Sequence, residues 1–314
     1  MSGGKTFRGF QRRAGVPRRG FTLIELLVVI SIVVMLMALL LPSLSRARKQ
    51  ARAVVCQNTC RQWGIMFTVY AAEHDGHLMF TPYIWHMGPE IYIYSDELGK
   101  ASFLCPEAGK NNAGPAPDVR PARTRRDGGS GRGGKFTAWW NYLYDDGSPP
   151  LLRLFSCSYG TNGWIGDPTP EKHYATGVSE AEADAFRAYA QKRWTRATLR
   201  SPSQIPVLFD CALTGATPWD TDEPPAYEED FTTVSGSSDY WEPIHNTTRF
   251  ACFDRHGRGT VNVAFLDGSA RKVGLKELWT LKWYTQCSTR GPWTRAGGAL
   301  PEDWPEWMRQ FKDY

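Results

Sequence analysis

An uninterrupted apolar run near the N-terminus constrains this chain more than any other feature. Residues 21–41 are apolar except for Thr22, Glu25 and Ser31. About 20 residues, each rising about 1.5 Å, match the roughly 30 Å hydrocarbon core of a membrane. The run therefore predicts a membrane-spanning helix with Pro42 directly after it. Glu25 needs a partner for its carboxylate, because a lone charge inside a membrane is costly.

The residues around the start of this run resemble a known processing signal. A basic leader ends at Gly20, the apolar run begins at Phe21, and Glu25 is the fifth residue after the glycine. Residues 19–27 are similar to the N-terminal signal of type IV prepilins and type II secretion pseudopilins. The resemblance implies that a prepilin peptidase cuts after Gly20 and that the new N-terminus at Phe21 is methylated.

Cleavage at this position would create the partner that the membrane carboxylate needs. The ammonium group of Phe21 would lie one helical turn from Glu25, and the same carboxylate can reach the ammonium group of a neighbouring subunit. The resemblance implies that such pairing registers subunits in a filament, with Phe21, Glu25 and Pro42 as assembly residues. An uncleaved anchor and a secretory signal peptide are the alternatives, but the run is too long for a signal peptide.

Positive charges flank the run on both sides. Four cations follow it within residues 46–52, and six precede it: Lys5, Arg8, Arg12, Arg13, Arg18 and Arg19. An excess of Lys and Arg marks the cytoplasmic side, so these counts narrowly favour a cytoplasmic leader. The resemblance implies the same orientation in a single-pass inner-membrane protein, with the C-terminal domain periplasmic or extracellular and the processed chain in a filament.

The resemblance also implies a set of partners. These are the prepilin peptidase, other pilin or pseudopilin subunits, the inner-membrane assembly machinery and membrane lipid. Nucleic acid is not among them, because the basic balance of the chain belongs to the leader. Of 37 Lys and Arg, six lie in residues 1–20, which leaves 31 against 32 Asp and Glu and a net charge of −1. The processed chain therefore offers no electrostatic argument for nucleic-acid binding.

The sequence divides into a leader, a span, a stalk and a body. The leader is residues 1–20, the transmembrane helix is 21–41, and the stalk part of the same helix is 42–73. Residues 74–314 form a globular αβ domain, and a Gly/Arg-rich insertion at 107–135 has too few large apolar residues to order itself. The prediction is an α+β, pilin-like fold in which the long helix packs on a body with an antiparallel sheet.

One face of the stalk carries apolar side chains. Cys56, Cys60, Trp63, Phe67 and Tyr70 recur at helical spacing, which predicts that this face packs on the body. Two cysteines four residues apart also invite a metal-site interpretation. Neither has a matching Cys-x-x-Cys or His pair elsewhere, so packing is the prediction for both. Seven cysteines in an oxidising compartment favour disulfides, but the sequence assigns no pairing.

The second half of the body is predicted to contain β-strands and a helix after them. Residues 204–210 indicate a short buried strand. Residues 260–266 and 269–273, separated by Asp267-Gly268, indicate a β-hairpin, because Asp-Gly is a strong turn signal. Apolar residues at helical spacing from Leu275 onward predict a helix after the hairpin.

This hairpin carries a second resemblance. His256, followed by Asp267 and Gly268, is similar to a processing-associated element of a large pilin-like family, in which nine residues separate the His from Asp-Gly. Here ten residues intervene. Cys105-Pro106 and residues 158–162 also fit landmarks of that family. We interpret His256, Asp267 and Gly268 as structural turn residues, with a metal or docking site built from His256 and Asp267 as the alternative.

An acidic loop suggests a cation site. Asp220, Asp222 and Glu223 are calcium candidates, because clustered carboxylates supply several of the six to eight oxygens that calcium needs. The loop lacks the ligand spacing of an EF-hand, and acidic runs are commonly solvated. No cofactor other than calcium is suggested.

The predicted function is that of a structural subunit of a type IV pilus or type II secretion pseudopilus-like filament. No catalytic motif is present, so enzymatic activity is not expected. The alternatives are a membrane-anchored surface binding protein or adhesin and, less well supported, an anchored periplasmic enzyme. Exposed tryptophans would favour a binding platform, whereas buried tryptophans would belong to the core. The late tryptophans, predicted to be core, are Trp279, Trp283, Trp293, Trp304 and Trp307.

Overall fold

The computed structural model describes residues 22–79, 104–108, 110–111, 130–131, 135, 137–144, 152–166, 189–197, 201–213, 215–231 and 245–314. The chain divides into two compact units, Met1–Arg48 and Lys49–Tyr314. The first unit contains the apolar part of helix α1 (Leu23–Glu73), and the second contains the rest of α1 and the body. The fold is α+β, as predicted.

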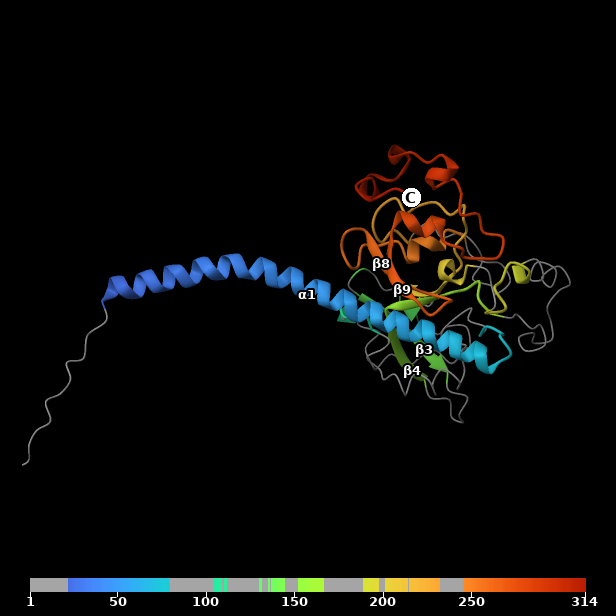
Figure 1. Ribbon diagram of the computed structural model, residues 1–314, viewed down its shortest axis with the longest axis horizontal. Coiled ribbons are helices and arrows are strands. Elements are labelled where there is room, and N and C mark those ends of the chain that lie inside the picture. Colours follow the sequence, from blue (N-terminus) through green and yellow to red (C-terminus); the bar gives the residue numbers. More distant parts are fainter. Residues whose placement is uncertain are drawn as a thin grey trace, which may run out of the picture. The chain divides into compact units, whose positions relative to one another are not determined.

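Helix α1 is 51 residues long, or about 75 Å at its rise per residue. It begins with a capping box at Thr22: the hydroxyl oxygen accepts from the amide of Glu25, and the Glu25 carboxylate accepts from the amide of Thr22. Pro42 lies inside the helix. The lost N–H of this proline does not end the helix, and the expected continuation to Glu73 is confirmed (Figure 1).

In the first unit, the apolar side chains of α1 are exposed. Every described residue from Thr22 to Arg48 is exposed, including the large apolar ones from Leu23 to Leu41. Among the described residues, α1 is the one helix that is long and apolar enough to span a membrane. An apolar surface of this length is typical of a segment that lies in lipid or packs against other chains.

The body contains a five-stranded mixed sheet with the order β7-β5-β6-β8-β9. Its strands are β5 (Tyr159–Asn162), β6 (Pro206–Asp210), β7 (Gly215–Ala216), β8 (Thr260–Phe265) and β9 (Ala270–Gly274). The predicted hairpin is β8–β9, with Asp267 and Gly268 in its turn, and it pairs antiparallel (Figure 1). Every other pair is also antiparallel except β5 with the edge strand β7, which is parallel.

A second sheet has four strands: β1 (Lys110–Asn111), β2 (Ser130–Gly131), β3 (Thr137–Tyr144) and β4 (Leu152–Cys157). Strand β3 pairs antiparallel with β2 and β4 and parallel with β1. Strands β1 and β2 belong to the region predicted as a Gly/Arg-rich insertion. Most of that region lies outside the described residues.

The five-stranded sheet separates two hydrophobic clusters. Side chains of β8 alternate between them: Val261, Val263 and Phe265 lie in one cluster, and Ala264 lies in the other, which also contains the buried face of α1. Asn262 points to the α1 side, where its amide donates to the carbonyl of Ala53. Successive side chains of a strand point to opposite faces of its sheet. The alternation along β8 therefore places α1 on one face of the sheet.

The predicted stalk face is confirmed. Cys56, Cys60, Trp63 and Phe67 are buried, and Tyr70 is half-buried. Gly64 lies on the same face, and a Cβ atom there would be 3.3 Å from the Cβ of Ala264. The helix thus crosses β8 closely enough that a small residue is needed at the crossing.

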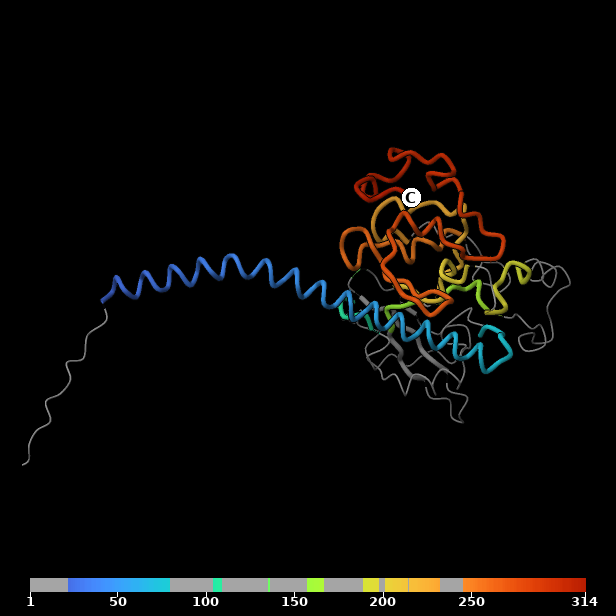
Figure 2. The backbone as a smooth tube through the Cα atoms, in the orientation of Figure 1, coloured from blue at the N-terminus to red at the C-terminus, as the bar shows by residue number. Residues whose placement is uncertain are grey.

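The chain after β9 forms short 3₁₀ helices and turns. The helix predicted from Leu275 is one 3₁₀ turn, η4 (Lys276–Thr280), because Leu281 is extended and directs the chain away. Residues after β9, red in Figure 2, gather on one side of the body. Of the five late tryptophans, Trp279, Trp283 and Trp304 are buried and the other two are partly buried against the same cluster. The prediction that they are core residues is confirmed.

We expect Gly160→Ala to destabilise the body. A Cβ atom at Gly160 would lie 2.7 Å from the Sγ and Cβ atoms of Cys211 and from the backbone oxygen of Leu213. Overpacking of this kind costs about 1–3 kcal/mol. Urea unfolding of the detergent-solubilised chain, followed by tryptophan fluorescence, should show a lower midpoint. Gly64→Ala is the control, since it gains about 1 kcal/mol of helix propensity and should lose less. Equal midpoints for wild type and Gly160→Ala would contradict the packing described.

Candidate functional site

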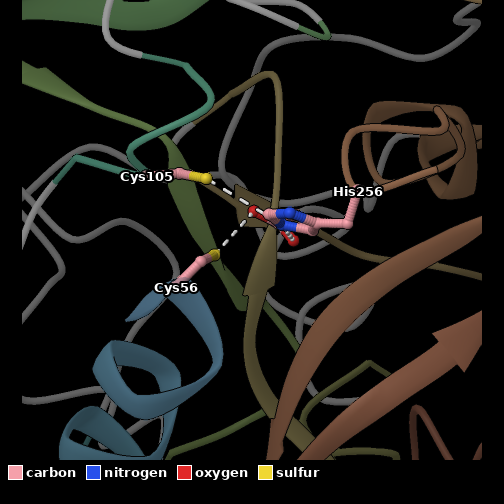
Figure 3. Close-up of side chains that lie close together, drawn as sticks. Cys56, Cys105 and His256 are labelled. Carbon is pink, nitrogen blue, oxygen red and sulfur yellow. Dashed lines mark hydrogen bonds and ion pairs between the residues drawn. The ribbon is translucent and has the colours of Figure 1, made fainter. Parts of the chain in front are cut away.

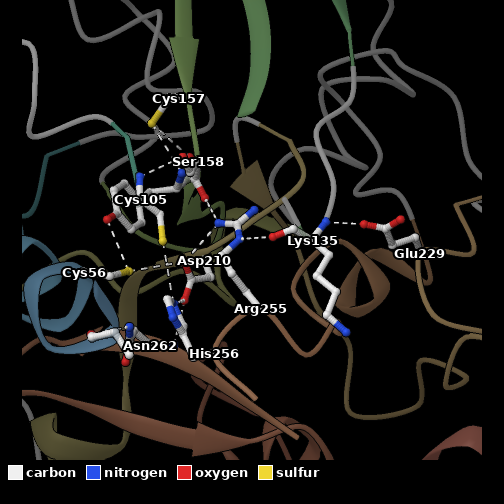
Figure 4. Close-up of polar contacts among 12 residues, drawn as sticks. Cys56, Cys105, Lys135, Cys157, Ser158, Asp210, Glu229, Arg255, His256 and Asn262 are labelled. Atoms are coloured by element: carbon white, nitrogen blue, oxygen red, sulfur yellow. Dashed lines mark hydrogen bonds and ion pairs between the residues drawn. The ribbon is translucent and has the colours of Figure 1, made fainter. Parts of the chain in front are cut away.

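A buried carboxylate at the end of β6 is the centre of a polar cluster in the body (Figure 4). The Asp210 side chain is fully buried. Its Oδ1 atom accepts from Nη1 of Arg255 at 2.9 Å. Its Oδ2 atom lies 2.9 Å from Nε2 of His256 and accepts from the amide of Asn262 at 2.8 Å. Strand β6, the segment before β8 and strand β8 itself thus converge on one carboxylate.

The positive partners determine the charge of this carboxylate. Burial alone would raise the pKa of Asp210, but the charges of His256 and Arg255, with their hydrogen bonds, outweigh burial and hold that pKa well below its ordinary value. Burial would lower the pKa of His256, but the charge and hydrogen bond of Asp210 raise it to about 9. In the metal-free cluster, a charged Asp210 therefore faces two cations near neutral pH.

Two thiols complete the cluster (Figure 3). Cys56 comes from α1, and its Sγ atom is 3.6 Å from Oδ1 of Asp210. Cys105 comes from the segment 104–108, and its Sγ atom is 3.8 Å from Nε2 of His256. Burial raises the pKa of Cys56, and contact with Cys56 together with burial raises the pKa of Cys105. Both thiols are therefore protonated when no metal is bound.

These four side chains offer the ligand types of a metal site. One ligand atom from each of Cys56, Cys105, Asp210 and His256 lies within 4.8 Å of the others, and all four residues are buried. Sequence reasoning predicted Cys56 and Cys60 as packing residues. Cys60 lies in the hydrophobic core, whereas Cys56 also faces Asp210. Asp210 was not singled out, because it ends an apolar strand and no local pattern marks it.

The hairpin residues singled out from the sequence do not meet one another. Asp267 is exposed and accepts from the amide and hydroxyl of Ser269 at 2.9 and 2.6 Å, and Gly268 has a φ of 75°. These two residues form the hairpin turn. His256 lies against Asp210. The carboxylate beside this histidine is therefore Asp210 and not Asp267, the one considered from the sequence.

The calcium candidates have separate contacts. The buried carboxylate of Asp222 accepts from the amide of Asn246 and from the amide and hydroxyl of Thr248. Asp220 accepts from the hydroxyl of Tyr284 and from the amide of Ser288. Glu223 lines an open depression that Trp293 and Asp303 also line. The three carboxylates thus serve different neighbours, and calcium binding stays a prediction.

At the other end of the chain, two of the three polar residues of the apolar run, Thr22 and Glu25, lie at the start of α1. The carboxylate of Glu25 accepts from the amide of Thr22 at 2.9 Å and from its hydroxyl at 2.8 Å. Both residues are exposed. The predicted processing residues Gly20 and Phe21 lie outside the described residues. The spacing Thr-x-x-Glu is the sequence signature of a capping box, and it would have identified this contact in advance.

Comparison with known proteins identifies a sequence motif at this end of the chain. Residues 17–41 match the family model described as the prokaryotic N-terminal methylation motif. The chain carries a prepilin-type signal. The matched residues include the predicted cleavage site and the whole apolar run, and α1 begins within them and continues to Glu73. No curated protein and no solved structure matches the chain.

We expect Asp210→Asn to destabilise the body by about 3–5 kcal/mol, because it removes the charged carboxylate from a buried ion pair with Arg255. The measurement is urea unfolding of the detergent-solubilised chain. Asp267→Asn makes the same chemical change at an exposed turn and should shift stability by no more than about 0.5 kcal/mol. A small effect at both positions would mean that Asp210 does not carry the buried charge.

Proposed function

We propose that this protein is the precursor of a structural subunit in a type IV pilus or type II secretion pseudopilus-like filament. The observation that supports the proposal is the methylation motif at residues 17–41, together with the exposed apolar side chains of α1 within it. Such a surface is unstable in water, so it needs lipid before assembly and neighbouring helices afterwards. A filament supplies the second environment.

In this proposal the leader faces the cytoplasm and the body lies outside it. The prepilin peptidase cuts after Gly20, methylates Phe21, and leaves a chain that the inner-membrane assembly machinery inserts into the filament. The Lys and Arg residues before the apolar span of α1 support this orientation. Seven of the described tryptophans are buried in the two hydrophobic clusters, and Trp293 and Trp307 are partly buried against one of them, which favours a structural role over the alternative of an aromatic binding surface.

Glu25 has two roles in this proposal. In the isolated chain it closes the capping box with Thr22. In the filament its charge pairs with the ammonium group of Phe21 of a neighbouring subunit, because that partner removes the cost of a charge in an apolar environment. The first role needs a hydrogen-bond acceptor, and the second needs a negative charge.

The processing step is tested by the N-terminus of the mature protein. We expect the wild-type chain, made with a prepilin peptidase, to begin at Phe21 and to carry one added methyl group. Gly20→Ala should leave the leader attached, because the peptidase requires the glycine. Intact-mass and N-terminal peptide analysis of the membrane fraction measures both. A wild-type chain that still begins at Met1 would contradict the proposal.

The assembly step is tested by separating charge from capping. Glu25→Gln keeps an oxygen that can cap the helix but removes the charge, so we expect normal cleavage and at least a tenfold loss of filaments, about 1.4 kcal/mol per factor of ten. Thr22→Ala breaks the cap and keeps the charge, so filaments should form. Sheared filaments and membranes, compared by immunoblot, give the readout. Glu25→Gln filaments at the wild-type level would argue that capping alone explains the glutamate.

A further inference from the structure

We propose that Cys56, Cys105, Asp210 and His256 form a buried four-coordinate zinc site in the body. All four residues belong to the unit Lys49–Tyr314. The proposal therefore does not depend on the filament function, which rests on the first unit. Figure 3 shows the two thiols and the imidazole pointing toward one another from α1, from the segment around Cys105 and from the segment before β8.

The separations between the side chains fit a tetrahedral ion. Zinc binds sulfur at about 2.3 Å and nitrogen or oxygen at about 2.0–2.2 Å, which puts neighbouring ligand atoms about 3.3–3.8 Å apart. The Sγ atom of Cys56 is 3.6 Å from Asp210 Oδ1, and the Sγ atom of Cys105 is 3.8 Å from His256 Nε2. The contact of His256 Nε2 with Oδ2 of Asp210, 2.9 Å, is shorter than this range. Because all four ligand atoms lie within 4.8 Å of one another, side-chain shifts of about 1 Å or less would bring them into this range.

The donor set selects the class of metal. Two thiolates and an imidazole favour zinc over magnesium or calcium, which take oxygen ligands. One carboxylate oxygen of Asp210 completes four ligands, the usual number in a structural zinc site. Calcium at this position would lack the six to eight oxygens that it needs.

The charges of the loaded site also balance. Two thiolates and the carboxylate of Asp210 supply three negative charges, and a zinc ion with Arg255 supplies three positive ones. Arg255 is fully buried and 2.9 Å from Asp210. Because an unbalanced charge is costly away from water, a neutral sum favours the loaded form. Binding releases three protons to solvent, two from the thiols and one from the imidazolium of His256, and involves no oxidation or reduction.

Hydrogen bonds already orient the ligands from outside. Arg255 and the amide of Asn262 hold the carboxylate of Asp210. The hydroxyl of Tyr159 donates to the Sγ atom of Cys56 at 3.3 Å. The hydroxyl of Ser158 accepts from the amide of Cys105 at 2.9 Å. Outer contacts of this kind fix the direction of metal ligands, so the proposed ion would link α1, the Cys105 segment, β6 and the segment before β8.

The test is zinc content and cobalt spectroscopy of the full chain, tag-free and purified in detergent without chelator. We expect about one zinc per chain by elemental analysis in wild type, and loss of most of it in Cys105→Ser and His256→Gln. Cys60→Ser is the matched control, because Cys60 is equally buried one turn along α1 but is not a proposed ligand. It should keep its zinc. Cobalt should give thiolate charge-transfer and tetrahedral bands in wild type and Cys60→Ser.

Three results would overturn the proposal. The first is a chain without zinc in which all seven cysteines react as free thiols after unfolding. The second is a disulfide between Cys56 and Cys105, seen as two missing thiols that return on reduction. The third is full zinc content in both ligand variants. If Cys105→Ser does not fold, the wild-type cobalt spectrum still decides, since its thiolate band is absent unless sulfur binds the metal.

Discussion

The body depends on one buried charge. Asp210 lies at the end of an apolar strand with no access to water, and a carboxylate there is tolerated only with complementary charge and hydrogen bonds. Arg255, His256 and the amide of Asn262 supply them. Meeting this requirement brings the segment before β8 against β6, and the same pocket receives Cys56 of α1 and Cys105. The cluster proposed to bind zinc is therefore a consequence of neutralising one side chain.

The two parts of helix α1 have different surroundings. Up to Arg48 its side chains are exposed and mostly apolar, which suits lipid or neighbouring helices. From Ala53 onward it buries one stripe against the sheet, and Gly64 permits the close approach to β8. The capping box of Thr22 and Glu25 satisfies backbone donors at its start. One helix thus joins the prepilin-type signal to the folded body.

Local patterns in the sequence were enough to predict the elements that depend on neighbouring residues. The apolar run, the buried stripe of α1 and the β8–β9 hairpin follow from hydrophobic periodicity and from turn residues. The prepilin-type signal is contiguous, so it could be read directly from residues 19–27. The helix expected from Leu275 is only the short 3₁₀ helix η4, which ends where Leu281 becomes extended.

The polar cluster was decided by the tertiary structure alone. Cys56 and Asp210 are in contact although they are 154 residues apart in the sequence, and His256 and Asp210 are in contact although they are 46 residues apart. No periodicity reaches over such distances, so the sequence offered only the nearby Asp267 as an alternative partner for His256, beside the preferred interpretation of both as turn residues. The sequence by itself thus determined the membrane helix and its processing signal, because those depend on composition and adjacency. Only the fold determined which carboxylate is buried and which side chains surround it, because burial is a property of the whole packed chain.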